Sequence, residues 1–275
     1  MKERISSFLV HFELIVVSLF VLIPIVWIIL SSFNPGDSLA SSSLIPKKLT
    51  LYNYIRLFQE TNYLVWFKNS FLIATFTAVV SVVLIMITAW VVSRFRFKCR
   101  RLGLIGLLLL SMFPNFLSMT ALYTLYLTMG LLNHPLALVI IYAAGAIPYN
   151  VWLVKGYLDG ISKEIDEAAY IDGCSYFSTF FKIILPMSKP IITYCAVSQF
   201  MFPWMDFIMP SMLLSTDNDN TTVAIGLYNM IAGKENDKFT MFAAGSILIA
   251  IPITILFIVF QKYLVQGVAA GANKG

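Results

Sequence analysis

The side chains that could carry out chemistry are few in this sequence, and they are scattered along it. His11 and His134 have no metal-ligating neighbours, and no Ser/His/Asp set or catalytic pair of carboxylates is legible. Cys99, Cys174 and Cys195 are odd in number and show neither CxxC nor Cys/His spacing. The sequence therefore predicts no catalytic residue, no metal site and no disulfide.

Asp206 is the acidic residue that lies well inside an apolar stretch. A carboxylate in the middle of a bilayer costs about 2.5–3.5 kcal/mol on insertion scales, so it needs a partner in the protein or contact with a wet cavity. Two interpretations stay open. Asp206 is either a hydrogen-bonded structural residue in a helix broken by Pro203 and Pro210, or a residue that lines a cavity.

A polar segment over residues 159–186 is too long for a simple connection and too polar to enter a bilayer. We expect it to fold as two short helices. Ser162 and Ser175 can each cap a helix N-terminus, and Gly173 gives the chain freedom to turn between the helices. Pro186 limits how far the second helix can continue.

Helical periodicity gives these two helices distinct faces. At 100° per residue, Ala168 and Ala169 share one face of the first helix with Ile165, and Glu167 points the opposite way. One face of the second helix is apolar and consists of Phe177, Phe180, Phe181 and Ile184. Two interpretations of that face stay open: it packs under the membrane helices, or it contacts a partner. This pattern predicts that the segment folds as a small helical hairpin with an apolar side and a charged side.

The rest of the chain has the composition of a membrane protein. Of its 275 residues, 59% are hydrophobic and 12% are charged, which is more apolar surface than a soluble fold of this size needs. A helix of about 20 residues crosses the hydrocarbon core of a bilayer. We predict an all-α polytopic membrane protein, one transmembrane domain over 1–275, with six spans at about 9–31, 69–92, 104–128, 135–157, 190–214 and 241–263.

The positive charges orient these spans. The net charge of +5 comes from Lys and Arg clusters beside apolar runs, which indicates membrane topology rather than nucleic acid binding. If the N-terminus is cytoplasmic, roughly two thirds of these residues lie inside. We therefore predict cytoplasmic termini, a cytoplasmic tail over 264–275, and a cytoplasmic hairpin over 162–186. The cluster from Arg94 to Arg101 is explained as a stop-transfer anchor, with a lipid or partner site as the alternative.

The polar hairpin also carries a motif. Glu167-Ala168-Ala169 is followed by Gly173, then by Ile183 and by Leu185-Pro186, and every fixed position of the pattern is filled. This run resembles the EAA motif of ATP-binding-cassette (ABC) importer permeases. The resemblance implies the fold of a type I ABC importer permease. It further implies coupling to an ATPase through Glu167, Ala168, Ala169, Gly173, Ile183, Leu185 and Pro186.

A second resemblance, to the maltose-type carbohydrate permeases, covers about residues 50–275 and is strongest toward the C-terminus. It is carried by the runs that begin at Thr222, Phe242 and Phe260. The segment Trp204-Met205-Asp206-Phe207 is similar to that family's Trp-Asn-Asp/Glu-Phe, with Met205 in place of Asn. This resemblance implies a sugar, and in particular an oligosaccharide, as the cargo.

The resemblance implies partners as well. Such permeases pair with a second permease, expected here to be a different chain, dock onto two cytoplasmic ATPase subunits, and receive sugar from an extracytoplasmic binding protein. This chain has no G-x-x-x-x-G-K-[ST] phosphate loop, and Gly233-Lys234-Glu235 lacks both the spacing and the hydroxyl residue. We therefore expect no cofactor on this chain, ATP and Mg²⁺ on the ATPase subunits, and a location in the bacterial inner membrane among lipid.

Candidates for the sugar path are polar and aromatic residues of the predicted spans, because sugars are commonly held by polar groups beside an aromatic platform. These candidates are Asn115, Tyr123, Tyr149, Gln199, Trp204 and Asp206. In some members of the family the partner permease carries the sugar site. Two alternatives stay open: a peptide or anion as cargo, and an ion-driven secondary carrier, although no internal repeat is evident.

Overall fold

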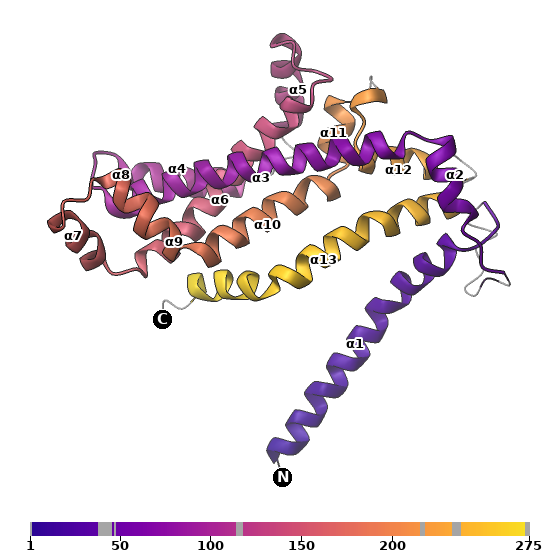
Figure 1. Cartoon of the computed structure of the whole chain (residues 1–275), viewed down its shortest axis with the longest axis horizontal. Coiled ribbons are helices and arrows are strands. Elements are labelled where there is room, and N and C mark those ends of the chain that lie inside the picture. The colour runs from indigo at the N-terminus through magenta and orange to yellow at the C-terminus, as the bar shows by residue number, and fades with distance from the viewer. Residues whose placement is uncertain are drawn as a thin grey trace. The chain divides into compact units, whose positions relative to one another are not determined.

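The computed structural model is helical in all its regular structure, and it describes residues 2–37, 46, 48–113, 118–214, 218–232 and 238–272 (Figure 1). The predicted all-α class is therefore confirmed. In these ranges, the helices long and apolar enough to cross a bilayer are α1 (Lys2–Ser32), α3 (Tyr63–Arg94), α6 (Pro135–Asp159) and α13 (Phe239–Ala272). A bent pair, Tyr176–Met187 with Lys189–Met205, makes a fifth if it is one span. The six-span topology stays a prediction.

Two of the predicted spans are each built from two helices. The stretch 104–128 contains α4 (Arg100–Met112) and α5 (Met119–Thr128), and 190–214 contains α10 (Lys189–Met205) and α11 (Ile208–Leu213). Helix α10 ends shortly after Pro203, and Oδ1 of Asp206 then accepts a hydrogen bond from the backbone N–H of Ile208 at 2.9 Å. A proline followed by a capping carboxylate explains this second break.

The structure describes part of the predicted tail over 264–275. Helix α13 continues to Ala272, so the part of this tail that the structure describes is helical and carries on from the membrane helix. The last three positions, 273–275, lie outside the described residues.

The chain forms two compact units, described here one at a time. Unit 1 comprises residues 1–64 and 226–252, and it includes α1, α2 (Tyr52–Glu60), the end of α12 (Val223–Ile231) and the first part of α13. Only 6% of the apolar span of α1 is buried within the chain. Lipid or another protein must therefore cover this helix.

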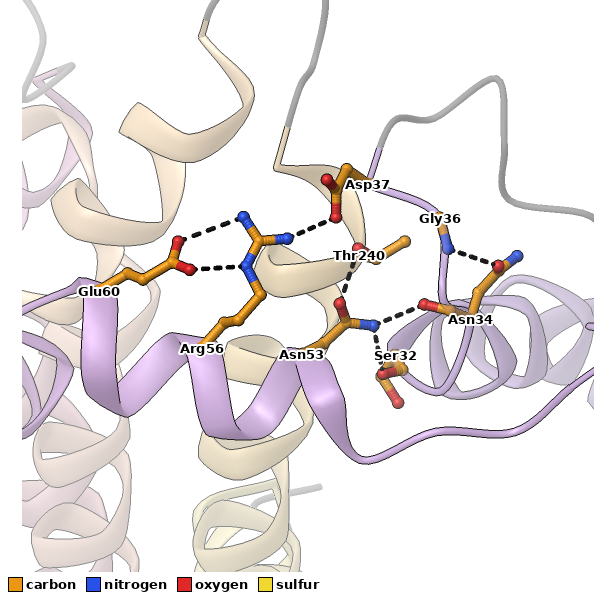
Figure 2. A network of polar contacts seen from close by, with 8 residues as sticks. All are labelled: Ser32, Asn34, Gly36, Asp37, Asn53, Arg56, Glu60 and Thr240. Atoms are coloured by element: carbon orange, nitrogen blue, oxygen red, sulfur yellow. Dashed lines mark hydrogen bonds and ion pairs between the residues drawn. The ribbon is translucent and has the colours of Figure 1, made fainter.

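A network of polar side chains ties the end of α1 to α2 and α13 (Figure 2). Nδ2 of Asn53 donates to the backbone carbonyls of Ser32 at 3.0 Å and Asn34 at 2.7 Å, and its Oδ1 accepts from Oγ1 of Thr240 at 3.2 Å. Asn53 has no exposed surface. Its amide thus satisfies carbonyls at the end of α1 that water does not reach.

Further contacts in unit 1 fix α2 and α13. Arg56 pairs with Asp37 and with Glu60, where Nε lies 2.8 Å from Oε1 (Figure 2). The Tyr63 hydroxyl donates to the carbonyl of Gly245 at 3.0 Å. A Cβ atom at Gly245 would stand 2.5 Å from Cδ2 of Leu227, so any larger residue there would force the Leu227 side chain to move.

Unit 2 comprises residues 65–225 and 253–275 and has two apolar cores. One core joins α3, α5, α6 and α11 around Ile73, Leu138 and Leu213. The other joins α3, α4, α6 and α10 around Ile85, Val151 and Ile191, and it also contains Phe180 and Ile184 of the polar hairpin. The hairpin itself consists of α7 (Lys163–Ile171), α8 (Tyr176–Thr179), the π-helical turn η3 (Phe180–Ile184) and α9 (Leu185–Met187). Its second half is therefore part of the folded core.

Candidate functional site

The polar segment 159–186 folds as the predicted helical hairpin. Oγ of Ser162 accepts from the backbone N–H of Glu164 at 3.3 Å and caps α7. Oγ of Ser175 accepts from the backbone N–H of Ser178 at 3.2 Å and caps α8. Between the two helices the backbone of Gly173 is left-handed, with φ of 84°. Both caps and the turn predicted from the sequence are confirmed.

The motif residues of α7 and the turn divide between the surface and the core. Glu167 and Ala168 are exposed, whereas Ala169 is only 5% exposed. Gly173 is exposed, and no atom lies within 4 Å of the place that a Cβ would take. The turn thus requires glycine because of its backbone angle and not because of crowding.

The motif residues of the second half lie where the hairpin returns to the membrane helices. Ile183 and Leu185 are half-buried, and Pro186 is exposed in the first turn of α9.

A buried ion pair fastens the hairpin to the end of α3. Nε of Arg94 lies 2.8 Å from Oδ2 of Asp166, and the two side chains are 4% and 6% exposed. Nη2 of Arg94 also donates to the backbone carbonyl of Ile161 at 3.1 Å. Burial raises the pKa of the Asp166 carboxyl, and the neighbouring Arg94 opposes that rise. The two opposite charges compensate each other at a place where either one alone would be costly.

Polar contacts next to this pair join α3 to the end of α6. Oγ of Ser93 donates to Oδ1 of Asp159 at 2.7 Å, and Nζ of Lys155 lies 2.6 Å from Oδ2 of the same carboxylate. Helices α3, α6 and α7 are thus linked through charged side chains at one end of unit 2.

Only part of the apolar face predicted for the second helix is buried. Phe180 and Ile184 are 4% and 0% exposed, and the ring of Phe180 lies 4.7 Å from that of Trp90 in α3. Phe177 and Phe181 are 72% and 45% exposed, with their rings 4.5 Å apart. The rings of Phe180 and Phe181 also lie 5.0 Å apart, so the predicted face is continuous but only its 180/184 side is buried in the chain. Phe180 and Ile184 therefore pack in the core, and Phe177 and Phe181 remain available for contact with a partner.

The ion pair was missed by sequence reasoning, which assigned Arg94 to a stop-transfer anchor and did not single out Asp166. Asp166 lies three residues before Ala169 and therefore shares the buried side of α7. A carboxylate on a buried face needs a cation, and this signal was present in the periodicity. The periodicity did not identify Arg94 as this cation, because Arg94 lies in a distant part of the chain.

The predicted sugar-path residues are not joined into one site by hydrogen bonds in the part of the chain that the structure describes. Asn115 lies outside the described residues. Tyr123 in α5 and Tyr149 in α6 are 39% and 59% exposed, and Gln199 in α10 is half-buried.

The other two path candidates have well-defined packing partners. Trp204 is 5% exposed and packs edge-on against Phe67, with the ring centroids 5.1 Å apart. Oδ2 of Asp206 accepts from the Tyr142 hydroxyl at 2.8 Å, and its Oδ1 caps α11. Asp206 thus has the hydrogen bonds of a structural residue, which is one of the two interpretations left open by the sequence.

Comparison with known proteins defines the class of this protein. Residues 81–270, which include the whole hairpin, match the family described as binding-protein-dependent transport system inner membrane component. The chain belongs to this family of ABC importer permeases and is an inner membrane protein. The resemblance inferred from the EAA motif is therefore confirmed.

Relatives similar along nearly the whole chain are permeases of sugar transport systems. The chain is 42% identical to the galactooligosaccharides transport system permease protein GanQ of Bacillus subtilis over 255 residues, which is 92% of this chain and 90% of GanQ. It is 36% identical to the maltodextrin transport system permease protein MalD of Streptococcus pneumoniae over 275 residues, covering 100% and 98% of the two chains. The maltose-type resemblance is confirmed by these relatives.

A solved structure shares the fold. It is the crystal structure of a bacterial ABC transporter involved in the import of the acidic polysaccharide alginate. The match has a TM-score of 0.82 and 21% sequence identity, and it covers 96% of this chain and 98% of the other. This chain therefore has the fold of a chain of that transporter.

Proposed function

We propose that this chain is one of two permease subunits of an ATP-driven oligosaccharide importer. It would form the translocation path with a second permease that is a different chain, and would couple through the hairpin α7–α9 to two cytoplasmic ATPase subunits. ATP and Mg²⁺ would be bound by those subunits, and an extracytoplasmic binding protein would deliver the sugar. The relatives named for galactooligosaccharides and maltodextrin support an oligosaccharide as cargo.

The observation that carries the coupling role is the opposite placement of two neighbouring carboxylates. Asp166 is buried against Arg94, whereas the next residue, Glu167, is exposed. The first anchors the hairpin to a membrane helix, and the second is available to a basic group on a partner. A displacement of the hairpin would therefore pass directly into α3.

The other motif residues fit the same role. Ala168 is small and exposed beside Glu167, so it allows a partner surface to approach closely. The Gly173 turn sets the angle between the two hairpin helices, while Ile183, Leu185 and Pro186 join the second helix to α10. Phe177 and Phe181 would add an apolar contact, since large exposed aromatic side chains are frequent in binding surfaces.

For the sugar path, Tyr123 and Tyr149 are the candidates that the geometry favours, because both side chains have exposed rings. Trp204 and Asp206 would instead stabilise the helices that line the path, through their contacts with Phe67 and Tyr142. Gln199 is half-buried and could contribute an amide.

Purification of the tagged chain from cells that express the whole importer tests this function. A second permease and two ATPase subunits should co-purify, and in liposomes ATP hydrolysis should rise when the binding protein is loaded with oligosaccharide. A chain that moves solute by itself down an ion gradient would show a secondary carrier. Stimulation by a peptide- or anion-loaded binding protein, with none by sugar, would contradict the cargo.

A further inference from the structure

The loop between α3 and α4 contains an open hollow of about 500 Å³ that the proposed function does not use. Three arginines and three less polar residues line most of it: Arg96, Arg100, Arg101, Phe97, Cys99 and Leu102. The hollow is therefore strongly basic and has an apolar margin.

The arginines of this hollow have no acidic partner among the residues that the structure describes: no carboxylate there lies at ion-pair distance from Arg96, Arg100 or Arg101. Nε of Arg100 donates to the backbone carbonyl of Val92 at 2.7 Å, which holds that side chain against the last turn of α3. Guanidinium groups gathered without counter-charges favour an anion between them, and they match the geometry of phosphate oxygens.

The position of the hollow indicates where the anion comes from. Helix α3 ends at Arg94 and α4 begins at Arg100, so the loop joins two apolar helices and is expected at the membrane surface. Phe97 and Leu102 are 49% and 68% exposed beside the arginines. Phosphate groups and acyl chains meet at this level of a bilayer, so one ligand can satisfy both the basic and the apolar side chains.

We propose that this hollow binds the phosphate of an anionic phospholipid. Arg96 and Arg101 would contact the phosphate oxygens, and Arg100 would supply the third guanidinium group. Phe97 and Leu102 would lie against the acyl chains. A free phosphate ion offers the same oxygens without the chains, so the two sources can be told apart. The assignment is independent of the cargo and of the ATPase coupling.

The test uses the purified importer that contains the full chain, after exchange into detergent. Fluorescent phosphatidylglycerol is titrated, with phosphatidylcholine as the zwitterionic comparison and inorganic phosphate as a competitor. The double variant R96Q/R101Q should bind phosphatidylglycerol about 10- to 30-fold more weakly, because each basic group near a membrane surface contributes about a factor of five. R96K/R101K keeps the charge and should retain most of the affinity.

The double variant K189Q/K262Q is the matched control, because it removes the same charge from exposed lysines outside the hollow. It should bind the lipid as the wild type does. Equal weakening in this control, unchanged binding by R96Q/R101Q, or equal losses in the lysine and glutamine variants of the arginines would overturn the proposal. Displacement of the lipid by an equal concentration of inorganic phosphate would show a site for the free ion. Release of an ATPase subunit by R96Q/R101Q, with unchanged lipid affinity, would show that the hollow faces protein.

Discussion

Nε of Arg94, the last residue of α3, lies 2.8 Å from Oδ2 of Asp166 in α7, and both side chains are almost fully buried. These residues are far apart in the sequence, and their contact is where a membrane helix meets the hairpin that carries the EAA motif. The pair therefore attaches the hairpin directly to α3. If the hairpin couples to an ATPase as proposed, this coupling would involve Arg94 as well as the motif.

Removing one partner of the pair should be much worse than removing both. Arg94→Ala or Asp166→Ala leaves a buried charge uncompensated, which costs about 3–5 kcal/mol in such pairs. The double variant should lose less than the sum of the two single losses. Thermal unfolding of the purified importer measures this, and Glu164→Ala, at an exposed position of the same helix, is the control. Wild-type stability in Asp166→Ala would contradict the anchoring role.

Gly173 should be replaceable only by a residue that accepts a left-handed backbone. Its φ is 84° and a Cβ would meet no atom within 4 Å, so Gly173→Asn should keep most transport. Gly173→Val should lose transport even where some ATPase docking survives, because a β-branched residue opposes this conformation. Sugar uptake and ATPase co-purification, measured together, separate the two effects. Gly156→Ala, in the interior of α6 with no crowding, is the control; equal uptake by the Val and Asn variants would refute the backbone argument.

Asn53 should be the most sensitive position of the α2 network. Its amide group is fully buried and donates to two backbone carbonyls, so Asn53→Ala should lower stability by about 1–3 kcal/mol. Asn53→Asp should be worse, because a carboxylate oxygen would then face the carbonyls of Ser32 and Asn34 (Figure 2). Melting temperatures of the purified variants check this order. The exposed Gln59 on the same helix supplies the control substitution, Gln59→Ala.

Local features of the hairpin could be predicted from the sequence, and its long-range contacts could not. The caps at Ser162 and Ser175 and the turn at Gly173 depend on residue type and on nearest neighbours, so spacing was sufficient. The pairing of Arg94 with Asp166 depends on tertiary packing that no period encodes.

The distinction between local features and long-range contacts also explains the other places where the structure adds to the sequence-based predictions. Pro203 was seen as an interruption, but the capping of α11 by Asp206 requires the chain to turn there in three dimensions. The partial burial of the aromatic face follows from which side of η3 meets Trp90, and a helical wheel gives the angles between residues but not the side that is covered.

The topology can be tested with single cysteines in a background without Cys99, Cys174 and Cys195. Lys48 precedes α2 and Asp172 lies at the hairpin turn, and both are exposed. With cytoplasmic termini, Lys48→Cys should react with an impermeant maleimide in intact spheroplasts, and Asp172→Cys should react only after lysis. Labelling of both from outside would invert the side assigned to the hairpin.

The most direct test of the coupling role is the substitution Glu167→Lys. Glu167 is exposed beside the anchored Asp166, so reversal of its charge should leave the permease inserted and folded while ATPase docking weakens by about 10- to 150-fold. An acidic replacement of the basic group it contacts should restore docking. Glu164→Lys makes the same change of charge on the same helix, also at an exposed position, and serves as the control.

The decisive measurement is the amount of ATPase subunit that co-purifies with each variant, together with sugar-stimulated ATP hydrolysis in liposomes. The coupling role predicts that both fall for Glu167→Lys and that both stay near wild type for Glu164→Lys. Wild-type values of both for Glu167→Lys would contradict it.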